Sequence, residues 1–554
     1  MRKIIPLFVL MLTALTWTAY AGQDSNLPVW ARTGHWRIDD WYGGPIETAK
    51  GFLSGWPSFF DADPMVVYAE TTRYDPQRVD LIERARFNWV AVVWSAGFSD
   101  QSERVQQDLL RPFIAECHRR GIRVMAYLSI ANIFAEDMFA HVPESRTWVI
   151  RKDGQPVSYS AADYQKVGRV TRYMADLRNK GWQEQTLQRA LSAVDAGIDS
   201  LNFDNNFPEL YGLELMGQFK ARVLAEGRKR HPDLIVNSNY HASAYLLARC
   251  ENSVNTEDGR EPGIFPSPAG HDAGLQENRT ETPAIPVKGG GLILNAGLLR
   301  ILNAVSEGWR PIVVAHSQQY VGTLMSAVLP PAHQKLVLAE CQAFQAANEN
   351  FQDGKPYSDL FYGDKKGGEN WEAIRLYNTF FDQYESLYSS PISLARIAVI
   401  INPESEQHDL ALLNRLAARN VIYDAVYEQD ALPAKLSPYA VIIAAPSVAL
   451  RPGWRRYENV RPAEIAAASP VTMAAPDSVV LNAHGQANTQ HVLVHLLNYG
   501  DTPVSGIEVS VRGQFKGGQL LSPDMVNTNI QIRPAGKFTQ ILIHELKTYD
   551  LLVL

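Results

Sequence analysis

The chain has 554 residues, of which 46% are hydrophobic and 20% are charged, proportions typical of globular proteins and not of disordered ones. Its formal net charge of −7 argues against a dedicated nucleic-acid or anionic-membrane binder, which would show basic clusters. Its three cysteines, Cys117, Cys250 and Cys341, lie far apart, which excludes a disulfide framework and a thiolate zinc site. We therefore expect a protein of several domains with a large core and no nucleic-acid partner.

The first 21 residues predict a secretory signal peptide. Arg2 and Lys3 make a positive start, and an apolar run follows from Ile4 to about Leu15. Residues 19–21 (Ala-Tyr-Ala) match a small-x-small cleavage site. The apolar run is short for a membrane anchor, which needs ~20 residues, so cleavage is favoured. We expect a mature chain that is secreted or periplasmic, with no membrane insertion after cleavage.

Between about residues 60 and 350, short β-like runs alternate with helical stretches. This alternation favours a parallel sheet with crossover helices. Helix signals fit it, with Asp75 before Pro76 as a start and Gly121 and Gly197 as stops. The count predicts a (β/α)8 TIM-type barrel, and an open doubly wound sheet is the alternative. The predicted strands are Val66–Ala69, Asn88–Trp94, Arg123–Ile130, Val170–Leu177, Asp199–Phe203, Leu234–Ser238, Ser253–Thr256 and Pro311–Ala315.

Two smaller units are predicted after the barrel. Arg396–Ile401, Asp409–Arg419 and Ala440–Ala445 have the order strand, helix, strand, which indicates a small flavodoxin-like α/β domain. Short strands with Gly, Pro and Asn turns then indicate an antiparallel β-sandwich. Those strands are Ser478–Leu481, His491–Asn498, Gly506–Arg512, Asn529–Arg533 and Thr539–His544. The expected domains are a signal peptide at 1–21, the barrel at 22–390, the α/β domain at 391–475 and the sandwich at 476–554.

Two acidic residues follow predicted barrel strands, where side chains reach the site at the top face of such a barrel. Asp204 follows the run Ile198–Phe203; capping of the next helix is its alternative role, although Asn206 is available as that cap. Glu257 follows the next-but-one strand; its alternatives are a surface pair with Arg260 and replacement in the role by Asp258. A glycosidase needs two such carboxyls, one protonated and one ionised, so Asp204 and Glu257 are the predicted catalytic pair.

Polar and aromatic residues recur at the other predicted strand ends. Sugar sites use aromatic faces against C–H surfaces and planar polar groups for hydroxyls. Tyr127, Ser129 and Asn132 lie around one strand end, and an aromatic-acidic cluster at residues 36–42 either completes the cleft or packs on the barrel. The predicted substrate-binding residues are Trp94, Asp176, Arg178, Asn205, Asn237, Asn239, Tyr240, Asp258 and His316.

Motifs of other chemistries are missing from the sequence. It contains no G-x-S-x-G elbow, no H-E-x-x-H, no P-loop and no G-x-G-x-x-G after a strand. Its histidines show no tight metal spacing. We therefore expect no cofactor and no metal, with a metal-dependent barrel hydrolase kept as an alternative.

The run that ends in Asp204 and Asn205 is similar to a strand-end signature of glycoside hydrolases related to α-galactosidases and α-L-fucosidases. This resemblance implies Asp204 as the nucleophile, Glu257 or Asp258 as the acid/base, and retention of configuration. The domain order resembles multidomain β-galactosidases, in which an amidotransferase-like domain and a small β-domain follow the barrel. Residues 338–344 and 495–499 resemble runs of those enzymes. The range 391–475 contains no cysteine, so amidotransferase activity is not expected.

The sequence thus predicts an exported glycoside hydrolase that acts on an oligosaccharide or polysaccharide. The first alternative is a non-catalytic glycan-binding protein on the same fold, because a fold does not determine a function. The second is the metal-dependent hydrolase. Homo-oligomerisation through the α/β domain is expected by analogy alone.

Overall fold

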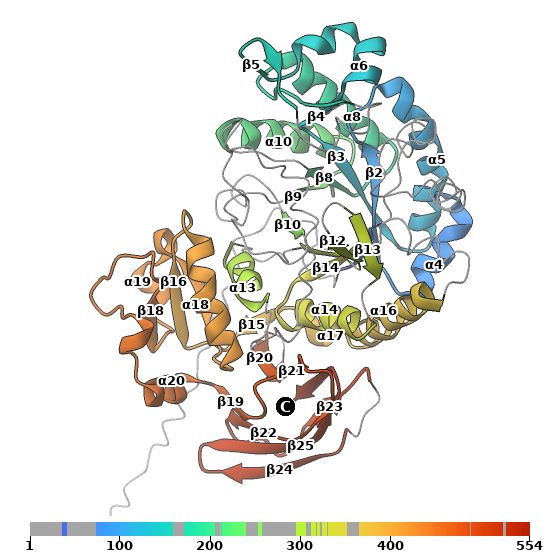
Figure 1. The fold of residues 1–554 in the computed structure, drawn as a ribbon. Helices are drawn as coiled ribbons and strands as arrows, with labels where there is room; N and C mark the ends of the chain where they lie inside the picture. Colours follow the sequence, from blue (N-terminus) through green and yellow to red (C-terminus); the bar gives the residue numbers. More distant parts are fainter. Residues whose placement is uncertain are drawn as a thin grey trace, which may run out of the picture.

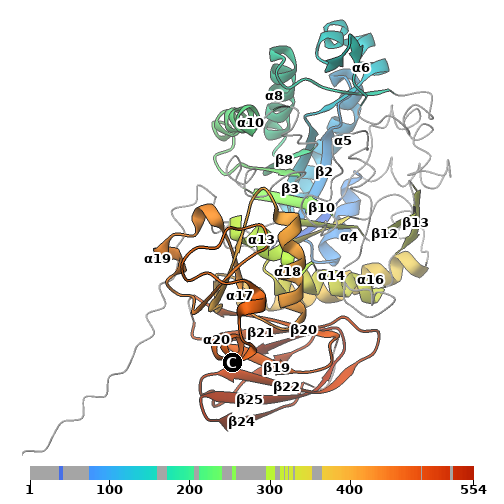
Figure 2. The same ribbon diagram turned by 60° about the vertical axis from the view of Figure 1, so that its left-hand side comes forward.

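The computed structural model describes residues 36–40, 74–158, 171–204, 211, 213–239, 253–257, 295–305, 312–316, 318–321, 324–328, 331–351, 365–487, 489–524 and 528–554. A barrel forms the largest part of the molecule (Figure 1). An α/β unit lies beside it, and a β-sandwich lies below its helices α14 and α16 in both views (Figure 2).

Eight parallel strands pair side by side in a closed ring, in the order β1-β2-β3-β8-β9-β10-β11-β14. The ring closes because β1 pairs with β14 on one side and with β2 on the other. A closed ring with helices between its strands is the barrel that the alternation predicts, and the open sheet is not formed. The strands are β1 Arg37–Asp40, β2 Trp89–Ser95, β3 Arg123–Ser129, β8 Ser200–Asp204, β9 Ile235–Asn239, β10 Ser253–Glu257, β11 Ile312–His316 and β14 Ala347–Phe351.

Six of the predicted barrel strands are present in the ring, and one prediction is contradicted by it. Val66–Ala69 lies outside the described residues. The barrel strand predicted at Val170–Leu177 is wrong, because β7 (Arg172–Met174) pairs antiparallel with β4 (Asn132–Phe134) outside the ring. An apolar run does not reveal which partner a strand takes. The sequence analysis missed β1 and β14 because RIDD and ANENF lack the apolar run of a buried parallel strand.

Helices cover the outside of the ring (Figure 1). The predicted start at Asp75 is confirmed, since its carboxylate accepts a hydrogen bond from the backbone N–H of Gln77. The predicted stops at Gly121 and Gly197 have φ of +75° and +98°, a conformation that suits the residue after a helix. The helices of the barrel are the 3-10 turn Pro76–Arg78, α4 Val79–Arg84, α5 Asp100–Arg119, α8 Lys180–Asp195, α10 Leu213–Arg228, α13 Ala296–Val305, α14 Pro331–Ala343, α16 Lys365–Gln383 and α17 Glu385–Tyr388.

Two connections after barrel strands carry structure of their own. Between β3 and α8 the chain forms an excursion that lies at one end of the barrel, at the top of Figure 1. Connections after the carboxyl ends of barrel strands shape the face where ligands bind. The excursion contains β4, α6 Ala135–His141, the 3-10 turn Pro143–Thr147, β5 Arg151–Lys152, β6 Gln155–Pro156 and β7, and the connection after β11 contains β12 Gln318–Val321 and β13 Leu324–Val328.

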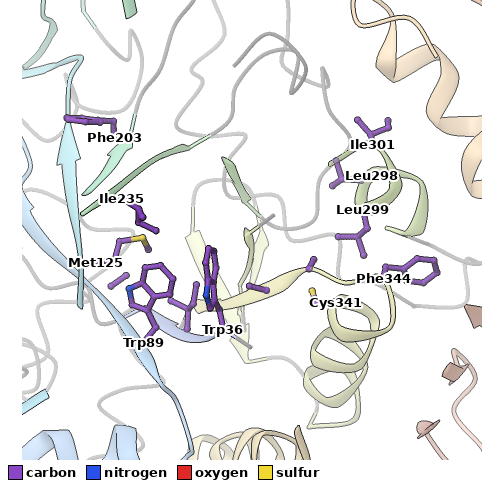
Figure 3. Close-up of a cluster of buried hydrophobic side chains, with 14 of the residues drawn as sticks. Trp36, Trp89, Met125, Phe203, Ile235, Leu298, Leu299, Ile301, Cys341 and Phe344 are labelled. Carbon is purple, nitrogen blue, oxygen red and sulfur yellow. The ribbon is translucent and has the colours of Figure 1, made fainter. Parts of the chain in front are cut away.

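Apolar side chains fill part of the barrel interior (Figure 3). The rings of Trp36 and Trp89 meet edge to face, with their centroids 4.7 Å apart and an interplanar angle of 79°. The register places Met125 and Ile235 on either side of Ser200 in neighbouring strands. Burial of such side chains supplies the main driving force for closing the barrel.

The α/β unit contains a three-stranded parallel sheet in the order β17-β16-β18. Its helix α18 packs against α13 of the barrel, where the backbone N–H of Gly297 donates to Oδ1 of Asn414 at 2.8 Å. The unit therefore contacts the barrel directly. Its elements are β16 Ile397–Ile401, α18 Glu406–Ala418, β17 Asp424–Tyr427, the 3-10 turn Glu428–Asp430, α19 Pro433–Leu436, β18 Val441–Ala444, the 3-10 turn Tyr457–Asn459 and α20 Pro462–Ala468.

The C-terminal unit is a sandwich of two antiparallel sheets, β15-β20-β21-β26-β23 and β19-β22-β25-β24. Two of its strands, β15 and β19, come from the range 391–475 expected for the α/β domain. The α/β unit is therefore inserted between two strands of the sandwich. The strands are β15 Pro391–Ser393, β19 Val471–Ala474, β20 Val479–Gln486, β21 Val492–Asn498, β22 Val504–Arg512, β23 Gln519–Leu521, β24 Ile530–Ala535, β25 Phe538–Leu546 and β26 Tyr549–Val553.

A buried carboxyl joins the barrel to the sandwich. Glu340 of α14 is 1% exposed and accepts hydrogen bonds from the backbone N–H and the side-chain amide of Asn295, each at 3.0 Å. The hydroxyl of Tyr499, in the sandwich, donates to the same carboxyl. Burial raises the pKa of Glu340, and these hydrogen bonds oppose that rise.

A second acidic cluster lies at the same junction. Asp524 of the sandwich contacts Nζ of Lys335 in α14 at 2.9 Å and accepts from the hydroxyl of Tyr377 in α16 at 2.8 Å. Asp550 is fully buried, and the hydroxyl of Ser522 lies beside its carboxyl. Burial, reinforced by the charge of Asp524, raises the pKa of Asp550 to about 8.

Replacing Gly97, which follows β2, is expected to destabilise the barrel. Its φ is +110°, and an added Cβ would lie 2.3 Å from the carbonyl oxygen of Asn132. We expect Gly97→Ala to lower the free energy of unfolding by about 2–4 kcal/mol, because backbone strain and a clash add. Gly121→Ala is the control, since its φ is +75° but nothing lies within 4 Å, and it should cost about 1 kcal/mol. Equal losses in urea unfolding would contradict the clash.

Asp550 is expected to make the protein less stable as pH rises. The unfolded carboxyl ionises near pH ~4, whereas burial holds the folded pKa at about 8. Between these values the folded protein keeps a proton that the unfolded chain has released, so stability falls as pH rises. Asp550→Asn should remove this decline and be more stable than the wild type by a few kcal/mol near pH ~8. Urea unfolding across that pH range measures the difference, and Asp477→Asn at an exposed position is the matched control.

Candidate active site

Four consecutive barrel strands end on polar residues that the sequence analysis selected. β8 ends at Asp204, β9 at Asn239, β10 at Glu257 and β11 at His316. These strands are neighbours in the ring and run parallel, so their carboxyl ends meet along one arc of the rim. Residues at the carboxyl ends of barrel strands form the ligand site in proteins of this fold.

The barrel interior changes from apolar to polar towards this rim. Phe203 packs against Phe219 of the outer helix α10, with ring centroids 6.0 Å apart. Because neighbouring residues of a strand point to opposite faces, Asn202 and Asp204 face the interior. The register sets Asn202 beside Tyr127, one row above Ser200 and Met125, and sets Asp204 one row higher still. Along the barrel axis, Asp204 therefore follows the polar row of Tyr127 and Asn202, which follows the row that contains Met125.

Asp204 is held by a neighbouring phenol. It is 5% exposed, and the hydroxyl of Tyr127 on β3 donates to its Oδ2 at 2.5 Å. Its backbone carbonyl also accepts from the N–H of Ile130 at 3.4 Å. A carboxyl fixed by a hydrogen bond at a strand end is preorganised, which is what a nucleophile or a general base requires.

Asn202 is a second polar side chain in this part of the barrel, and the sequence analysis missed it. It is 2% exposed, and its Oδ1 has no hydrogen-bond partner within the described part of the chain. It lies in register between Tyr127 and Asn237, so it adds a planar polar group to this part of the interior. The signal in the sequence was its spacing, since it lies two residues before Asp204 on the same strand face.

The register locates the other candidate residues through the backbone alone. β10 lies two strands from β8, as the sequence analysis expected for Asp204 and Glu257. Glu257 pairs with Val314, which in turn pairs with Glu349 of β14, an acidic residue missed because its strand was not recognised. For Asn237, Asn239, Glu257 and His316 the structure describes the strand but not the side chain. Asn205, Tyr240 and Asp258 lie outside the described residues.

Asp176 and Arg178 do not end a barrel strand, which corrects the prediction for them. They lie between β7 and α8 and pair with each other at 2.7 Å, with the Arg178 side chain 55% exposed. The hydrogen bond that Arg178 donates to the Asp176 carboxylate raises the pKa of the Arg178 guanidinium. Asn179 then caps α8 by accepting from the backbone N–H of Gly181. The polar run therefore precedes a helix. The start of a helix and the end of a strand have similar polar compositions, so the sequence did not distinguish them.

The prediction that Trp94 binds substrate is also corrected, because its side chain packs outwards from the barrel. It is 1% exposed, and its indole N–H donates to Oγ of Ser192 in α8 at 3.0 Å. The guanidinium of Arg111 in α5 lies 5.6 Å from its ring centroid. The register explains this direction, since the preceding Val93 pairs with Tyr127 on the inner face.

The N-terminal aromatic-acidic cluster contributes to the barrel itself. Trp36 and Asp39 are buried in and before β1, and Trp36 packs on Trp89 inside the ring (Figure 3). Trp41 and Tyr42 lie outside the described residues. Of the two roles left open for this cluster, packing on the barrel is the one that Trp36 performs.

Two further properties concern only the described residues. No group of three or more histidine, cysteine, aspartate or glutamate side chains among them is arranged to hold a metal ion. None of the described helices is both long and apolar enough to cross a membrane.

No family model matches the chain, and no curated protein matches its sequence. Among solved structures, α-L-fucosidase isoenzyme 2 from Paenibacillus thiaminolyticus has a TM-score of 0.61 at 13% identity, covering 87% of this chain and 96% of the fucosidase. A β-galactosidase from the psychrophilic Marinomonas ef1 has a TM-score of 0.52 at 8% identity, covering 93% and 99%.

An α-amylase from Anoxybacillus has a TM-score of 0.51 at 9% identity, covering 95% of this chain and 98% of the amylase. Each of these proteins is a glycoside hydrolase by its description, and each is matched over nearly its whole length. At such low identities the similarity shows the fold. The chain therefore shares the fold of these three enzymes, and its own activity is a separate question.

Trp94 is expected to contribute to stability through its buried hydrogen bond. Trp94→Phe removes the indole N–H that Ser192 accepts, and it leaves a space between the strand and α8. We expect the free energy of unfolding to fall by about 1–3 kcal/mol. A double-mutant cycle with Ser192→Ala, measured in urea, should show coupling between the two residues. A Trp94 that lay on an open sugar-binding surface would show neither the loss nor the coupling.

Proposed function

We propose that this protein is a glycoside hydrolase with Asp204 and Glu257 as its carboxyl pair, acting on an oligosaccharide or polysaccharide. The observation that carries the proposal is the interior-facing, buried Asp204 at the end of β8, hydrogen-bonded by Tyr127. β10, two strands along the same rim, ends on Glu257. The similarity to a fucosidase, an amylase and a β-galactosidase supports the same reaction class.

The proposed reaction proceeds with retention in two displacements. The Asp204 carboxylate attacks the anomeric carbon, and the glycosidic oxygen leaves with a proton from the Glu257 carboxyl. Water then attacks the same carbon and gives its proton to the Glu257 carboxylate, which releases the sugar and restores Asp204. Retaining enzymes place the two carboxyls about 5–5.5 Å apart, and inverting enzymes place them about 6.5–9.5 Å apart. Asn202, Asn237, Asn239 and His316 would bind sugar hydroxyls around the pair.

We also propose that the protein acts outside the cytoplasm and without a cofactor. Arg2, Lys3, the apolar run after them and the Ala-Tyr-Ala site at 19–21 support secretion or a periplasmic location. The α/β unit lacks cysteine, so it would serve as an accessory unit, with self-association of the chain as its proposed role.

Two substitutions test the carboxyl pair. The purified mature protein is screened against aryl glycosides and cell-envelope polysaccharides together with Asp204→Asn and Glu257→Gln. We expect turnover by the wild type and a loss of at least about 100-fold in kcat/KM for each variant, because each removes a group that acts in the transition state. Glu372→Gln, which breaks an exposed ion pair with Arg375 on α16, is the matched control and should keep wild-type activity.

The outcomes separate the rival functions. Azide is expected to restore turnover to Glu257→Gln, since it needs no general base, and failure to do so would favour Asp258→Asn or Glu349→Gln as the informative variants. Activity that survives Asp204→Asn would place the reaction elsewhere. Sugar binding without turnover by the wild type would support a non-catalytic glycan-binding protein, and activity lost to chelators would support a metal-dependent hydrolase.

A further inference from the structure

The contact between Tyr127 and Asp204 joins two neighbouring barrel strands across one row of the register. Tyr127 is paired with Asn202, so its hydroxyl reaches forward along the barrel to the residue that ends β8. It donates to Oδ2 of Asp204 at 2.5 Å, a short distance that is typical of a hydrogen bond to an ionised acceptor. Asp204 is 5% exposed, so water has little access with which to replace this donor.

We propose that Tyr127 is a positioning residue that accelerates the second displacement, in which Asp204 leaves the sugar. This inference rests on the proposed function, with Asp204 as the nucleophile. The tyrosine keeps its proton throughout and makes no bond to the substrate. Its effect comes from the charge on the carboxyl that it contacts, which changes during the reaction.

The charge on Asp204 makes the two displacements respond differently to the hydroxyl. In the first, the carboxylate forms a bond to the anomeric carbon and the leaving-group oxygen departs with the proton of Glu257, so the charge on Asp204 disappears. In the second, water adds, the bond between Asp204 and the sugar breaks, and the charge returns. A hydrogen bond to a charged oxygen is stronger than one to an ester oxygen. The hydroxyl therefore stabilises the free carboxylate and the second transition state more than it stabilises the ester.

The location of Tyr127 separates this role from packing. The apolar part of the interior is filled by Trp36, Trp89 and the side chains around them (Figure 3). Tyr127→Phe keeps the ring and its volume and removes only the donor. A matched change exists in the α/β unit, where the hydroxyl of the buried Tyr423 donates to the carbonyl of Leu413 at 2.8 Å. Tyr423→Phe also removes one buried hydroxyl bond, but it lies away from the barrel strands.

The test compares the wild type, Tyr127→Phe and Tyr423→Phe as full-length mature proteins on an aryl glycoside with a good leaving group. For Tyr127→Phe we expect kcat to fall about 10- to 100-fold and KM to fall with it, because the ester accumulates when its breakdown slows. A burst approaching one equivalent of aryl alcohol should precede the steady rate. Intact-protein mass should show the glycosylated enzyme, with decay slowed by the same factor. Methanol, a better acceptor than water, should raise kcat.

Three results would decide against parts of this account. A lower kcat for Tyr127→Phe with an unchanged or higher KM and no burst would overturn the inference and leave the proposed function standing. Wild-type kinetics for Tyr127→Phe, with Asp204→Asn inactive, would do the same. Turnover that persists in Asp204→Asn would overturn the proposed function itself. Tyr423→Phe is expected to lose stability and to show no burst, and a burst in this variant would also overturn the inference.

Discussion

The barrel closes because β1 pairs with β14 on one side and with β2 on the other. Each strand of a closed ring finds a partner at both edges, so no backbone donor or acceptor of the ring is left at an open edge. Parallel pairing of consecutive strands also places the carboxyl ends of β8, β9, β10 and β11 along one arc of the rim. The candidate site depends on this pairing, because Asp204 and Glu257 are 53 positions apart in the sequence, and β9 joins the strands that carry them.

The barrel interior is divided between stability and chemistry. Aromatic and aliphatic side chains such as Trp36, Trp89 and Met125 fill one part, and an aromatic pair contributes about 0.5–1.5 kcal/mol beyond the area it buries. Tyr127, Asn202 and Asp204 form the polar part that follows along the same strands. These polar groups are costly to bury, and Asn202 has an acceptor atom that no described residue satisfies. The polar groups therefore lie at the end of the ring where the candidate site is, and the apolar packing lies away from it.

The sequence predicted the parts of this fold that have an apolar signature. Six barrel strands, the α/β unit and most sandwich strands carry runs of branched and aromatic residues, and Asp204 follows such a run. β1 and β14 have polar sequences, so their place in the ring depends on partners that no local pattern reveals. Trp94 and Asp176 were misplaced for a related reason. Trp94 lies at a strand end that faces the helices, and Asp176 lies just before a helix. In composition, both resemble a strand end that faces the site. Asn202 was within reach of the period-two pattern of strands.

The α/β unit begins after β15 and ends before β19, and these two strands belong to opposite sheets of the same sandwich. A domain on a single linker can rotate freely about it, and relative motion is then the default. Here both ends of the unit are fixed in one sandwich, and α18 also packs on α13 of the barrel. Swivelling of this unit as a rigid lid would have to break strand pairing at two places. The α/β unit is therefore held in one position beside the barrel.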